Sequence, residues 1–303
     1  MIAAGLDLGG TKIEAQVFDD DWRVAARRRI ATPPEYDALV EAMADQISWA
    51  EAQAGWPVPV GISAAGLVAP ATGLALTANL AASGRPFPAD IIAKVGRPVA
   101  YYNDCRAFTL SEATFGAGRG AQTVVGLIIG TGIGGGLTIA GRLVPGPAAV
   151  GGEFGHMAAP AALVVRHGLP VVCCGCGREA CVETLIAGPG LVRVAETVTG
   201  RHLTPPDIVA MRTSDADVAR AWGIWCELVA ELLLRITLMI DPDVVVLGGG
   251  LSQAEGLLDD LGEALRAAQW TGFGVPRLAL AEGGDASGAR GAAYAAWAEA
   301  RDG

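Results

Sequence analysis

Residues 2–18 read Ile2-Ala-Ala-Gly-Leu-Asp7-Leu-Gly9-Gly10-Thr11-Lys12-Ile13-Glu-Ala-Gln-Val-Phe18. The apolar runs at 2–8 and 13–18 predict two strands joined by a hairpin at Gly9, Gly10, Thr11 and Lys12. Because this turn offers backbone N–H groups and few bulky side chains, it can wrap phosphate oxygens closely. Asp7 lies at the same corner and could hold Mg²⁺ through water. The alternative is an ordinary glycine hairpin, whereas a Walker A loop is excluded because this turn joins strand to strand.

The same pattern returns in the middle of the chain. Residues 124–129 predict a strand, Gly130-Thr131-Gly132-Ile-Gly134-Gly135-Gly136 predicts a turn, and residues 137–140 predict the return strand. The turn also matches the G-x-G-x-x-G pattern of dinucleotide-binding proteins, but that motif must open a helix and this one leads into a strand. Two such hairpins on two repeated domains predict a nucleotide in the cleft between them.

A cluster of cysteines predicts a metal site. Cys174, Cys176 and Cys181 follow a C-x-C-x4-C spacing, and His156 lies upstream. Together they form a closed set of four tetrahedral zinc ligands without an open position for water, so we expect a structural ion. The alternatives are an apolar cysteine cluster or a redox pair.

Two glutamates, Glu153 and Glu183, bracket these ligands in the sequence. A metal that folds the segment would therefore also position two carboxylates and one imidazole. Such groups suit the binding of a polyhydroxylated ligand.

The composition fits a globular protein with two domains. The 303 residues are 51% hydrophobic and 18% charged, and the net charge of −10 argues against a nucleic-acid partner. We find no secretory signal in the first residues and no apolar run of membrane-spanning length. Four of the six cysteines crowd together, which is a poor disulfide framework and favours a reducing, cytoplasmic location.

Several small or polar residues follow predicted strands. The strand at 58–62 leads into a small-residue turn ending at Gly66, which suits close approach of a ligand. Asn79 follows, and it is either a turn residue or a hydrogen-bond partner of a ligand hydroxyl. A strand at 99–102 ends in Asn103 and Asp104, before a helix at 105–115. Asp104 is therefore either a helix cap or a catalytic base at the carboxyl edge of a sheet, and the local sequence favours the cap.

The last third of the chain is mostly helical. The apolar stretch at 215–240 predicts a long core helix, and residues 244–247 predict a buried strand. Gly249 and Gly250, directly after this strand, would let a flat ring lie against the backbone. A terminal helix closes the chain.

Taken together, the motifs resemble the ROK family (repressors, open reading frames and sugar kinases). The matching segments are Gly5-x-Asp7-x-Gly9-Gly10-Thr11-Lys12, Asn103-Asp104, Gly130-Thr131-Gly132, Glu153-Phe-Gly-His156 and Cys174-x-Cys176-Gly-x-x-Ala180-Cys181-x-Glu183. The resemblance implies an α/β, actin-like ATPase (ribonuclease-H-like) fold with two domains around a nucleotide and sugar cleft. We assign residues 1–118, joined by the terminal helix 287–303, to the N-terminal domain, and residues 119–286 with the zinc motif to the C-terminal domain.

The resemblance also implies roles for the candidate residues. Asp104 becomes the general base for a sugar 6-hydroxyl, and ATP with Mg²⁺ is the phosphoryl donor. The sugar contacts implied are Gly66, Asn79, Asn103, Asp104, Glu153, His156 and Glu183. The nucleotide contacts implied are Asp7, Gly9, Gly10, Thr11, Lys12, Thr131, Gly132, Gly249 and Gly250.

Segments around Asn79 and Glu153 resemble bacterial N-acetylglucosamine kinases most, so we expect phosphorylation of N-acetyl-D-glucosamine by a homodimer. The alternatives are N-acetylmannosamine, glucose or fructose kinases, or a sugar-sensing regulator without catalysis. Repressors of the family carry a DNA-binding segment before the first strand, which the start at Ile2 argues against. Ala65 and Ala180 depart from the family pattern, which usually has proline and glycine there, so Ala180 must avoid positive φ or accept strain.

Overall fold

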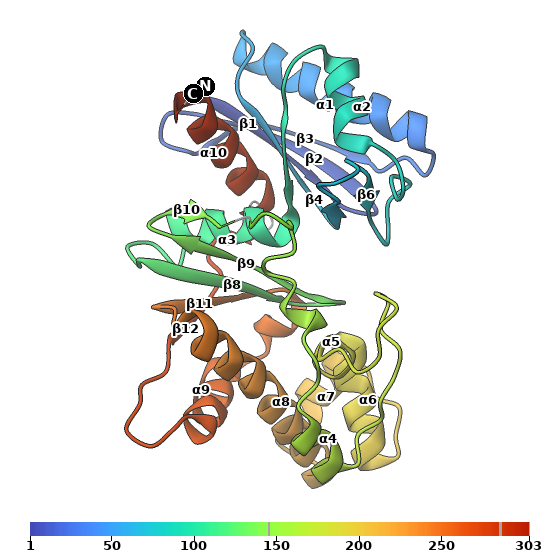
Figure 1. Cartoon of the computed structure of the whole chain (residues 1–303), viewed down its shortest axis with the longest axis vertical. Coiled ribbons are helices and arrows are strands. Elements are labelled where there is room, and N and C mark those ends of the chain that lie inside the picture. The colour runs from blue at the N-terminus through green and yellow to red at the C-terminus, as the bar shows by residue number, and fades with distance from the viewer. Residues whose placement is uncertain (145, 285–286, 303) are drawn as a thin grey trace. The chain divides into compact units, whose positions relative to one another are not determined.

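The computed structural model describes residues 1–144, 146–284 and 287–302, and the chain divides into two compact units (Figure 1). Unit 1 contains Met1–Gly120, Gly136–Gly151 and Glu282–Gly303, and unit 2 contains Ala121–Gly135 and Gly152–Ala281. The expected domain boundary at residues 286 and 287 adjoins Asp285 and Ala286, which lie outside the described residues. Residues 136–151 fall in unit 1, whereas the sequence analysis assigned them to the C-terminal domain.

Unit 1 contains a five-stranded sheet with the order β3-β2-β1-β4-β7. Its strands are β1 (Ala3–Leu8), β2 (Lys12–Phe18), β3 (Val24–Ala31), β4 (Val60–Ala64) and β7 (Ala100–Asn103). Strands β1, β2 and β3 form an antiparallel meander, and β4 and β7 run parallel to β1. A short hairpin, β5 (Leu67–Val68) with β6 (Ala75–Leu76), follows β4.

Helices cover both faces of this sheet, which the alternation along β1 explains. Leu6 and Leu8 are buried in one core with helices α1 (Tyr36–Ala54) and α2 (Phe87–Val95). On the other face, α10 (Ser287–Asp302) packs on β1 and β4, and also on α3 (Asp104–Phe115). Figure 1 shows this helix (dark red) beside the first strands (dark blue), which brings the two ends of the chain together.

The contact of α10 with the sheet depends on glycine. A Cβ added at Gly5 or Gly61 would lie 1.9 Å from the carbonyl oxygen of Ala289 or Ala292, respectively. The helix backbone therefore rests directly on β1 and β4, at a distance that no larger residue allows.

The second sheet repeats the first. Its strands are β8 (Thr123–Ile129), β9 (Ile133–Ile139), β10 (Arg142–Leu143), β11 (Val244–Gly248) and β12 (Arg277–Leu280), in the order β10-β9-β8-β11-β12. Strands β8, β11 and β12 are parallel, and β9 and β10 are antiparallel. Each sheet thus begins with a hairpin and adds two parallel strands on the far side, which confirms the repeat predicted from sequence.

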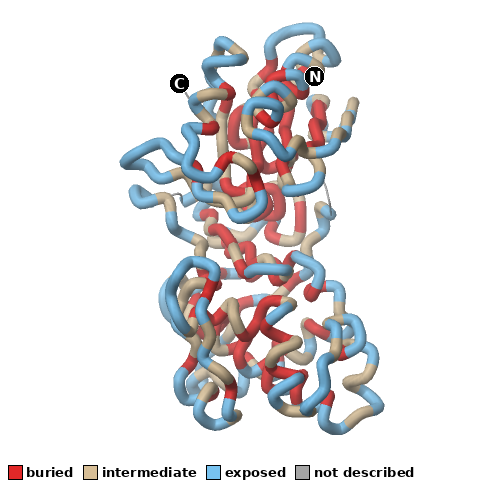
Figure 2. The backbone as a smooth tube through the Cα atoms, turned by 90° about the vertical axis from the view of Figure 1, so that its right-hand side faces the viewer, coloured by how far each residue is buried: buried red, intermediate tan, exposed pale blue. Residues whose placement is uncertain are grey.

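Most of the helices of unit 2 pack around the long helix α8 (Ala216–Ile240). The others are α4 (Ala161–His167), α5 (Glu183–Ile186), α6 (Gly188–Thr199), α7 (Pro205–Met211) and α9 (Leu257–Ala268), with 3₁₀ turns η1 (Phe154–His156) and η2 (Gly250–Gln253). Figure 2 shows the buried residues concentrated inside each unit. Trp225 is fully buried, stacks on Trp222 and donates from its ring nitrogen to the carbonyl of Ile186 at 2.9 Å, so the core role predicted for this helix is confirmed.

Two predicted turn boundaries were wrong. Strand β2 begins at Lys12 and β9 at Ile133, so both glycine turns contain three residues, 9–11 and 130–132. Gly134, Gly135 and Gly136 belong to β9, although glycine is disfavoured in strands. Close contacts explain them: a Cβ at Gly135 would lie 2.3 Å from the carbonyl of Gly126, and one at Gly136 would lie 2.6 Å from Thr109 Oγ1 on α3.

The contact of Gly136 with α3 also explains why residues 136–151 group with unit 1.

Within the described residues, no helix has the length and apolar character that crossing a membrane requires.

Candidate active site

The first glycine turn is closed by its own backbone and by the side chain of Thr32, which directly follows β3. Gly9 N–H donates to the Lys12 carbonyl at 2.9 Å, and Thr32 Oγ1 donates to the Gly9 carbonyl at 2.7 Å. A Cβ added at Gly10 would lie 3.1 Å from Asn79 Cβ, so the segment with the predicted sugar residue Asn79 packs directly against this turn. No local sequence pattern indicated a role for Thr32, which lies 20 residues after Lys12.

Asp7 lies beside the turn at the end of β1 and is held by Ser63. Ser63 Oγ donates to Asp7 Oδ1 at 3.1 Å, and a Cβ added at Gly288 would lie 2.7 Å from the same oxygen. Burial raises the pKa of Asp7 to about 6, the hydrogen bond from Ser63 lowers it, and the charge of Asp104 raises it further. Two carboxylates of unit 1 thus share one local electrostatic environment.

Asp104 is the first residue of α3, and its neighbour Asn103 is the helix cap. Asn103 Oδ1 accepts from the backbone N–H groups of Cys105 at 3.0 Å and Arg106 at 3.3 Å, while its Nδ2 donates to the Gly66 carbonyl at 3.0 Å. The interpretation of Asp104 as the cap was therefore wrong. Asp104 Oδ1 accepts from Cys105 N–H at 2.9 Å, and burial raises the pKa of Asp104. A carboxyl with a raised pKa is suited to accept a proton near neutral pH.

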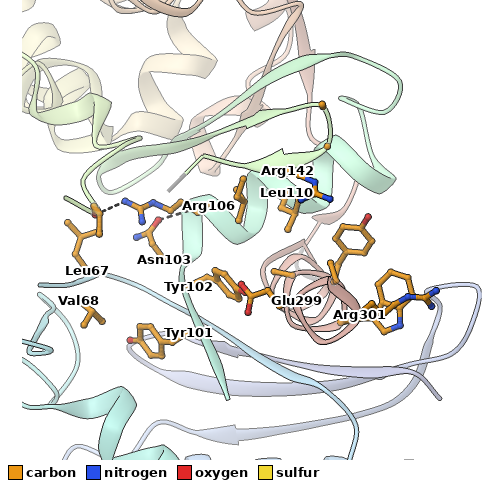
Figure 3. Close-up of a pocket in the computed structure, with 18 of the residues that line it drawn as sticks. Leu67, Val68, Tyr101, Tyr102, Asn103, Arg106, Leu110, Arg142, Glu299 and Arg301 are labelled. Carbon is orange, nitrogen blue, oxygen red and sulfur yellow. Dashed lines mark hydrogen bonds between the residues drawn. The ribbon is translucent and has the colours of Figure 1, made fainter. Parts of the chain in front are cut away.

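Arg106 connects the start of α3 with the loop that follows β10. Its Nη2 donates to the Ala149 carbonyl at 2.6 Å and its Nε to the Gly151 carbonyl at 3.2 Å. Figure 3 shows Arg106 and Asn103 together at one side of a cavity of about 700 Å³ in unit 1, with Tyr102 and Glu299 further along its wall. Tyr102 donates from its hydroxyl to Glu299 at 2.5 Å, so the polar groups in this part of the wall satisfy one another.

The second glycine turn is held at both of its ends in unit 2. Gly130 N–H donates to the Gly132 carbonyl at 3.0 Å, and Gly188 N–H at the start of α6 donates to the Gly130 carbonyl at 2.8 Å. After the turn, Ile133 N–H donates to Glu183 Oε2 at 2.8 Å. No helix begins at this turn, which confirms the rejection of the dinucleotide-binding motif.

Beside this turn lies a largely apolar cavity of about 750 Å³, which is enough for a nucleoside. Its wall is formed by Gly130, Thr131, Gly188, Pro189, Val192, Pro205, Pro206, Val209, Ala210, Gly250, Leu251, Gln253 and Ala254. Gly249 precedes Gly250 and is not one of the lining residues: its φ is +87°, and an added Cβ would lie 2.5 Å from the Ile129 carbonyl. The structure thus places one of the two predicted glycines, Gly250, at this cavity with Thr131.

The four predicted metal ligands form one cluster. The ligand atoms of His156, Cys174, Cys176 and Cys181 all lie within 4.8 Å of one another, with His156 Nδ1 and Cys174 Sγ 3.6 Å apart and Cys176 Sγ and Cys181 Sγ 3.6 Å apart. At zinc bond lengths, the edges of a tetrahedron are about 3.8 Å between two sulfurs and about 3.6 Å between sulfur and nitrogen. Two of the six separations between donor atoms therefore match a tetrahedral site, the others are no longer than 4.8 Å, and all described cysteines are free thiols.

Within this cluster the two ring nitrogens of His156 have different neighbours. Its Nδ1 points to Cys174, and its Nε2 lies 3.8 Å from Glu153 Oε2. One ring nitrogen is thus available to a metal, while the other lies beside a carboxylate that suits sugar hydroxyls. Glu183 Oε1 lies 3.6 Å from Cys174 Sγ, so both bracketing glutamates are near the cluster.

The predicted residues gather in groups within their own units. Asp7, Asn79, Asn103 and Asp104, with the first glycine turn and Gly66, belong to unit 1. Glu153, His156 and Glu183, with the cysteines, the second glycine turn and Gly249–Gly250, belong to unit 2. Sequence reasoning missed Ser63 and Thr32, whose roles depend on sheet pairing.

Comparisons with known proteins agree with this arrangement. The family model described as ROK family matches residues 3–299. The N-acetylgalactosamine kinase AgaK of Shewanella sp. (strain ANA-3) is 40% identical over 95% of this chain and 94% of its own, and an N-acetyl-D-glucosamine kinase of Escherichia coli O6:H1 (strain CFT073) is 38% identical over 96% and 97%. The crystal structure of a ROK hexokinase from Thermus thermophilus has a TM-score of 0.88 and 34% identity, with full coverage of both chains, so the actin-like fold predicted from sequence is confirmed.

Proposed function

Because this chain belongs to the ROK family, we propose that it transfers the γ-phosphoryl group of ATP to the 6-hydroxyl of an N-acetylated hexosamine, with N-acetyl-D-glucosamine as substrate. The observation that carries the proposal is the similarity of the whole chain, at 38% and 40% identity, to two kinases named for N-acetylated hexosamines. The features found within each unit support the same chemistry: unit 1 has a glycine turn and the partly buried carboxyl of Asp104, and unit 2 has a second glycine turn.

Asp104 is the general base in this proposal. Its carboxylate accepts the proton of the sugar 6-hydroxyl as that oxygen attacks the γ-phosphorus. The raised pKa of Asp104 makes it a better proton acceptor than an exposed aspartate, and its hydrogen bond from Cys105 N–H fixes the carboxylate at the start of α3. Asn103 holds the helix start in place through its cap.

The phosphates of ATP are assigned to the two turns, Gly9-Gly10-Thr11 with Lys12 and Thr131-Gly132. Lys12 supplies a compact positive charge. Asp7 would hold Mg²⁺ through the water shell of the ion, and the nearby cation would favour the charged form of this carboxyl, whose pKa is raised. The adenine ring is assigned to the cavity that Gly250 lines, next to Gly249 in the chain, because the wall of this cavity is largely apolar.

A zinc ion is assigned to His156, Cys174, Cys176 and Cys181, whose donor atoms fit a tetrahedral site. The ion would stabilise the fold of this segment and orient His156, and it would supply no reacting group. Elemental analysis should find about one zinc per chain. Purified protein that is fully active without metal would refute this assignment.

The remaining proposed sugar contacts are Gly66 and Asn79 in unit 1, and Glu153, His156 and Glu183 in unit 2. Asn103 can contribute little through Oδ1, because the cap uses that atom, so its contact must come from Nδ2. We further propose that the chain has the two domains expected from sequence, 1–118 with 287–303 and 119–286, which differ from the two compact units mainly at residues 136–151, and that the protein is a homodimer. Light scattering on the purified protein would test the oligomeric state.

A second candidate substrate is N-acetylgalactosamine, the C4 epimer, because the Shewanella kinase named for it is 40% identical. A coupled assay of ADP release across a panel of hexoses and N-acetylhexosamines separates the candidates by kcat/KM. The proposal predicts a higher kcat/KM for N-acetylglucosamine than for glucose, by up to several orders of magnitude. Polar groups that bind the acetamide would lack partners when a hydroxyl takes its place. A higher kcat/KM for glucose or fructose would overturn the choice of substrate.

A further inference from the structure

Glu183 lies between the cysteine cluster and the second glycine turn. Its Oε2 accepts from Ile133 N–H at 2.8 Å, and a Cβ added at Gly132 would lie 2.9 Å from the same oxygen. Its Oε1 lies 3.6 Å from Cys174 Sγ. One carboxylate thus contacts both the proposed metal site and the proposed phosphate turn, and all of these residues belong to unit 2.

The bond to Ile133 fixes the end of the turn. Ile133 is the first residue of β9 and is buried. If the carboxylate of Glu183 were removed, the N–H of Ile133 would lose its charged acceptor, and water could hardly replace it there. Gly130 at the other end is already fixed by Gly188 N–H. The position of the N–H groups between them, at Thr131 and Gly132, therefore depends on Glu183.

The cysteine cluster in turn fixes Glu183. The carboxylate belongs to the first residue of α5, two residues after Cys181. Thr184 donates to the Cys181 carbonyl from its backbone N–H at 3.0 Å and from its hydroxyl at 2.7 Å, and Val182 N–H donates to the Met157 carbonyl at 2.7 Å. A helix of four residues has little stability of its own, so its start follows the position of Cys181.

We propose that Glu183 is a positioning residue for the nucleotide turn, and that through it the metal cluster controls the affinity for ATP as well as the sugar site. This inference rests on the proposed function, because it takes the turn at Thr131 as a phosphate site. A glutamate that contacts sugar alone would leave nucleotide binding in sugar-free protein unchanged.

The test measures the Kd of the ATP analogue AMPPNP by calorimetry without sugar. Glu183→Ala should raise this Kd about tenfold, because a charge-assisted hydrogen bond is lost. Glu183→Gln should change it less than about threefold, since the amide oxygen still accepts from Ile133 N–H. Glu179→Ala, an exposed glutamate of the same cysteine segment, is the matched control and should bind like wild type.

Wild-type affinity in Glu183→Ala would overturn the inference, whereas absence of AMPPNP binding in wild type would refute the proposed nucleotide site itself. If Glu183→Ala fails to fold, hydrogen exchange on the wild-type protein tests the same coupling without a substitution. Chelation of the metal should speed exchange in a peptide that contains Ile133 more than in a peptide from α9. Equal acceleration of both peptides, or none, would contradict coupling of the cluster to the turn.

Discussion

Replacement of Asp7 by asparagine should stabilise the protein at neutral pH while abolishing much of its activity. Burial raises the pKa of Asp7 from its ordinary value of 3.8 to about 6. The folded state therefore binds a proton more tightly than the unfolded state, so the charged carboxylate opposes folding once the pH exceeds 3.8. This cost grows up to about pH 6 and is constant above it.

The size of the effect follows from the shift. About two pKa units correspond to about 3 kcal/mol, because one unit is 1.36 kcal/mol. Asparagine keeps an acceptor for Ser63 Oγ but loses the charge-assisted part of that bond, and Asp7 is only partly buried. We therefore expect a net gain of about 1–2 kcal/mol at pH 8, or a rise in Tm of about 2–5 °C.

Thermal unfolding from pH 4.5 to pH 8 measures the change. The gain in Tm of Asp7→Asn should shrink steadily as the pH falls from 6 toward 4.5, while the exposed control Asp20→Asn should show no such trend. A variant that is destabilised at pH 8, or a gain that does not depend on pH, would show that Asp7 carries no burial penalty. The kcat of the same variant tests whether the carboxylate of Asp7, which costs folding stability, is needed for catalysis with Mg²⁺-ATP.

Three further substitutions test other parts of the site. Asp104→Asn should lower kcat by roughly 10²–10⁴-fold with sugar binding largely retained, and a near-normal kcat would remove the base from this position. Cys181→Ser should lower both metal content and Tm, whereas a variant that keeps its zinc would contradict the ligand set. Ala180 has a φ of +56°, so Ala180→Gly should stabilise by about 1 kcal/mol, while Ala267→Gly on the exposed side of α9 should cost about the same. If both glycine variants are destabilised, Ala180 carries no backbone strain.

The parts of the fold that sequence predicted are those with short-range signals. The strand–turn–strand repeat and the C-x-C-x4-C spacing are local patterns, and the structure confirms the repeat and brings the predicted metal ligands together. The family resemblance left two alternatives for Ala180, avoidance of positive φ or acceptance of strain, and its φ of +56° favours the second.

The errors arose where a long-range contact decides the local structure. Gly135 and Gly136 of β9 were predicted to form a turn, yet glycine is required there by the Gly126 carbonyl and by Thr109 on α3, which lie 9 and 27 residues away. Likewise, Asn103 rather than Asp104 caps α3, because the helix begins one residue earlier than the sequence suggested. Local propensity cannot locate a contact that forms only after the sheets and helices pack.

Three carboxylates of unit 1, Glu112, Asp7 and Asp104, differ in how far hydrogen bonds compensate their burial. Glu112 is fully buried and accepts from the N–H groups of Ala117, Glu282 and Gly283 and from the hydroxyl of Ser287, at 2.8–3.2 Å, so its charge is well compensated and it holds the segment that leads into α10. By contrast, the only side-chain hydroxyl that donates to Asp7 among the described residues is Ser63, and burial dominates the pKa of Asp7 and of Asp104. A carboxylate whose burial outweighs its hydrogen bonds is costly to keep charged in a folded protein unless a cation or a transferred proton completes it, and this is the reason to propose Asp7 and Asp104, and not Glu112, for the chemistry.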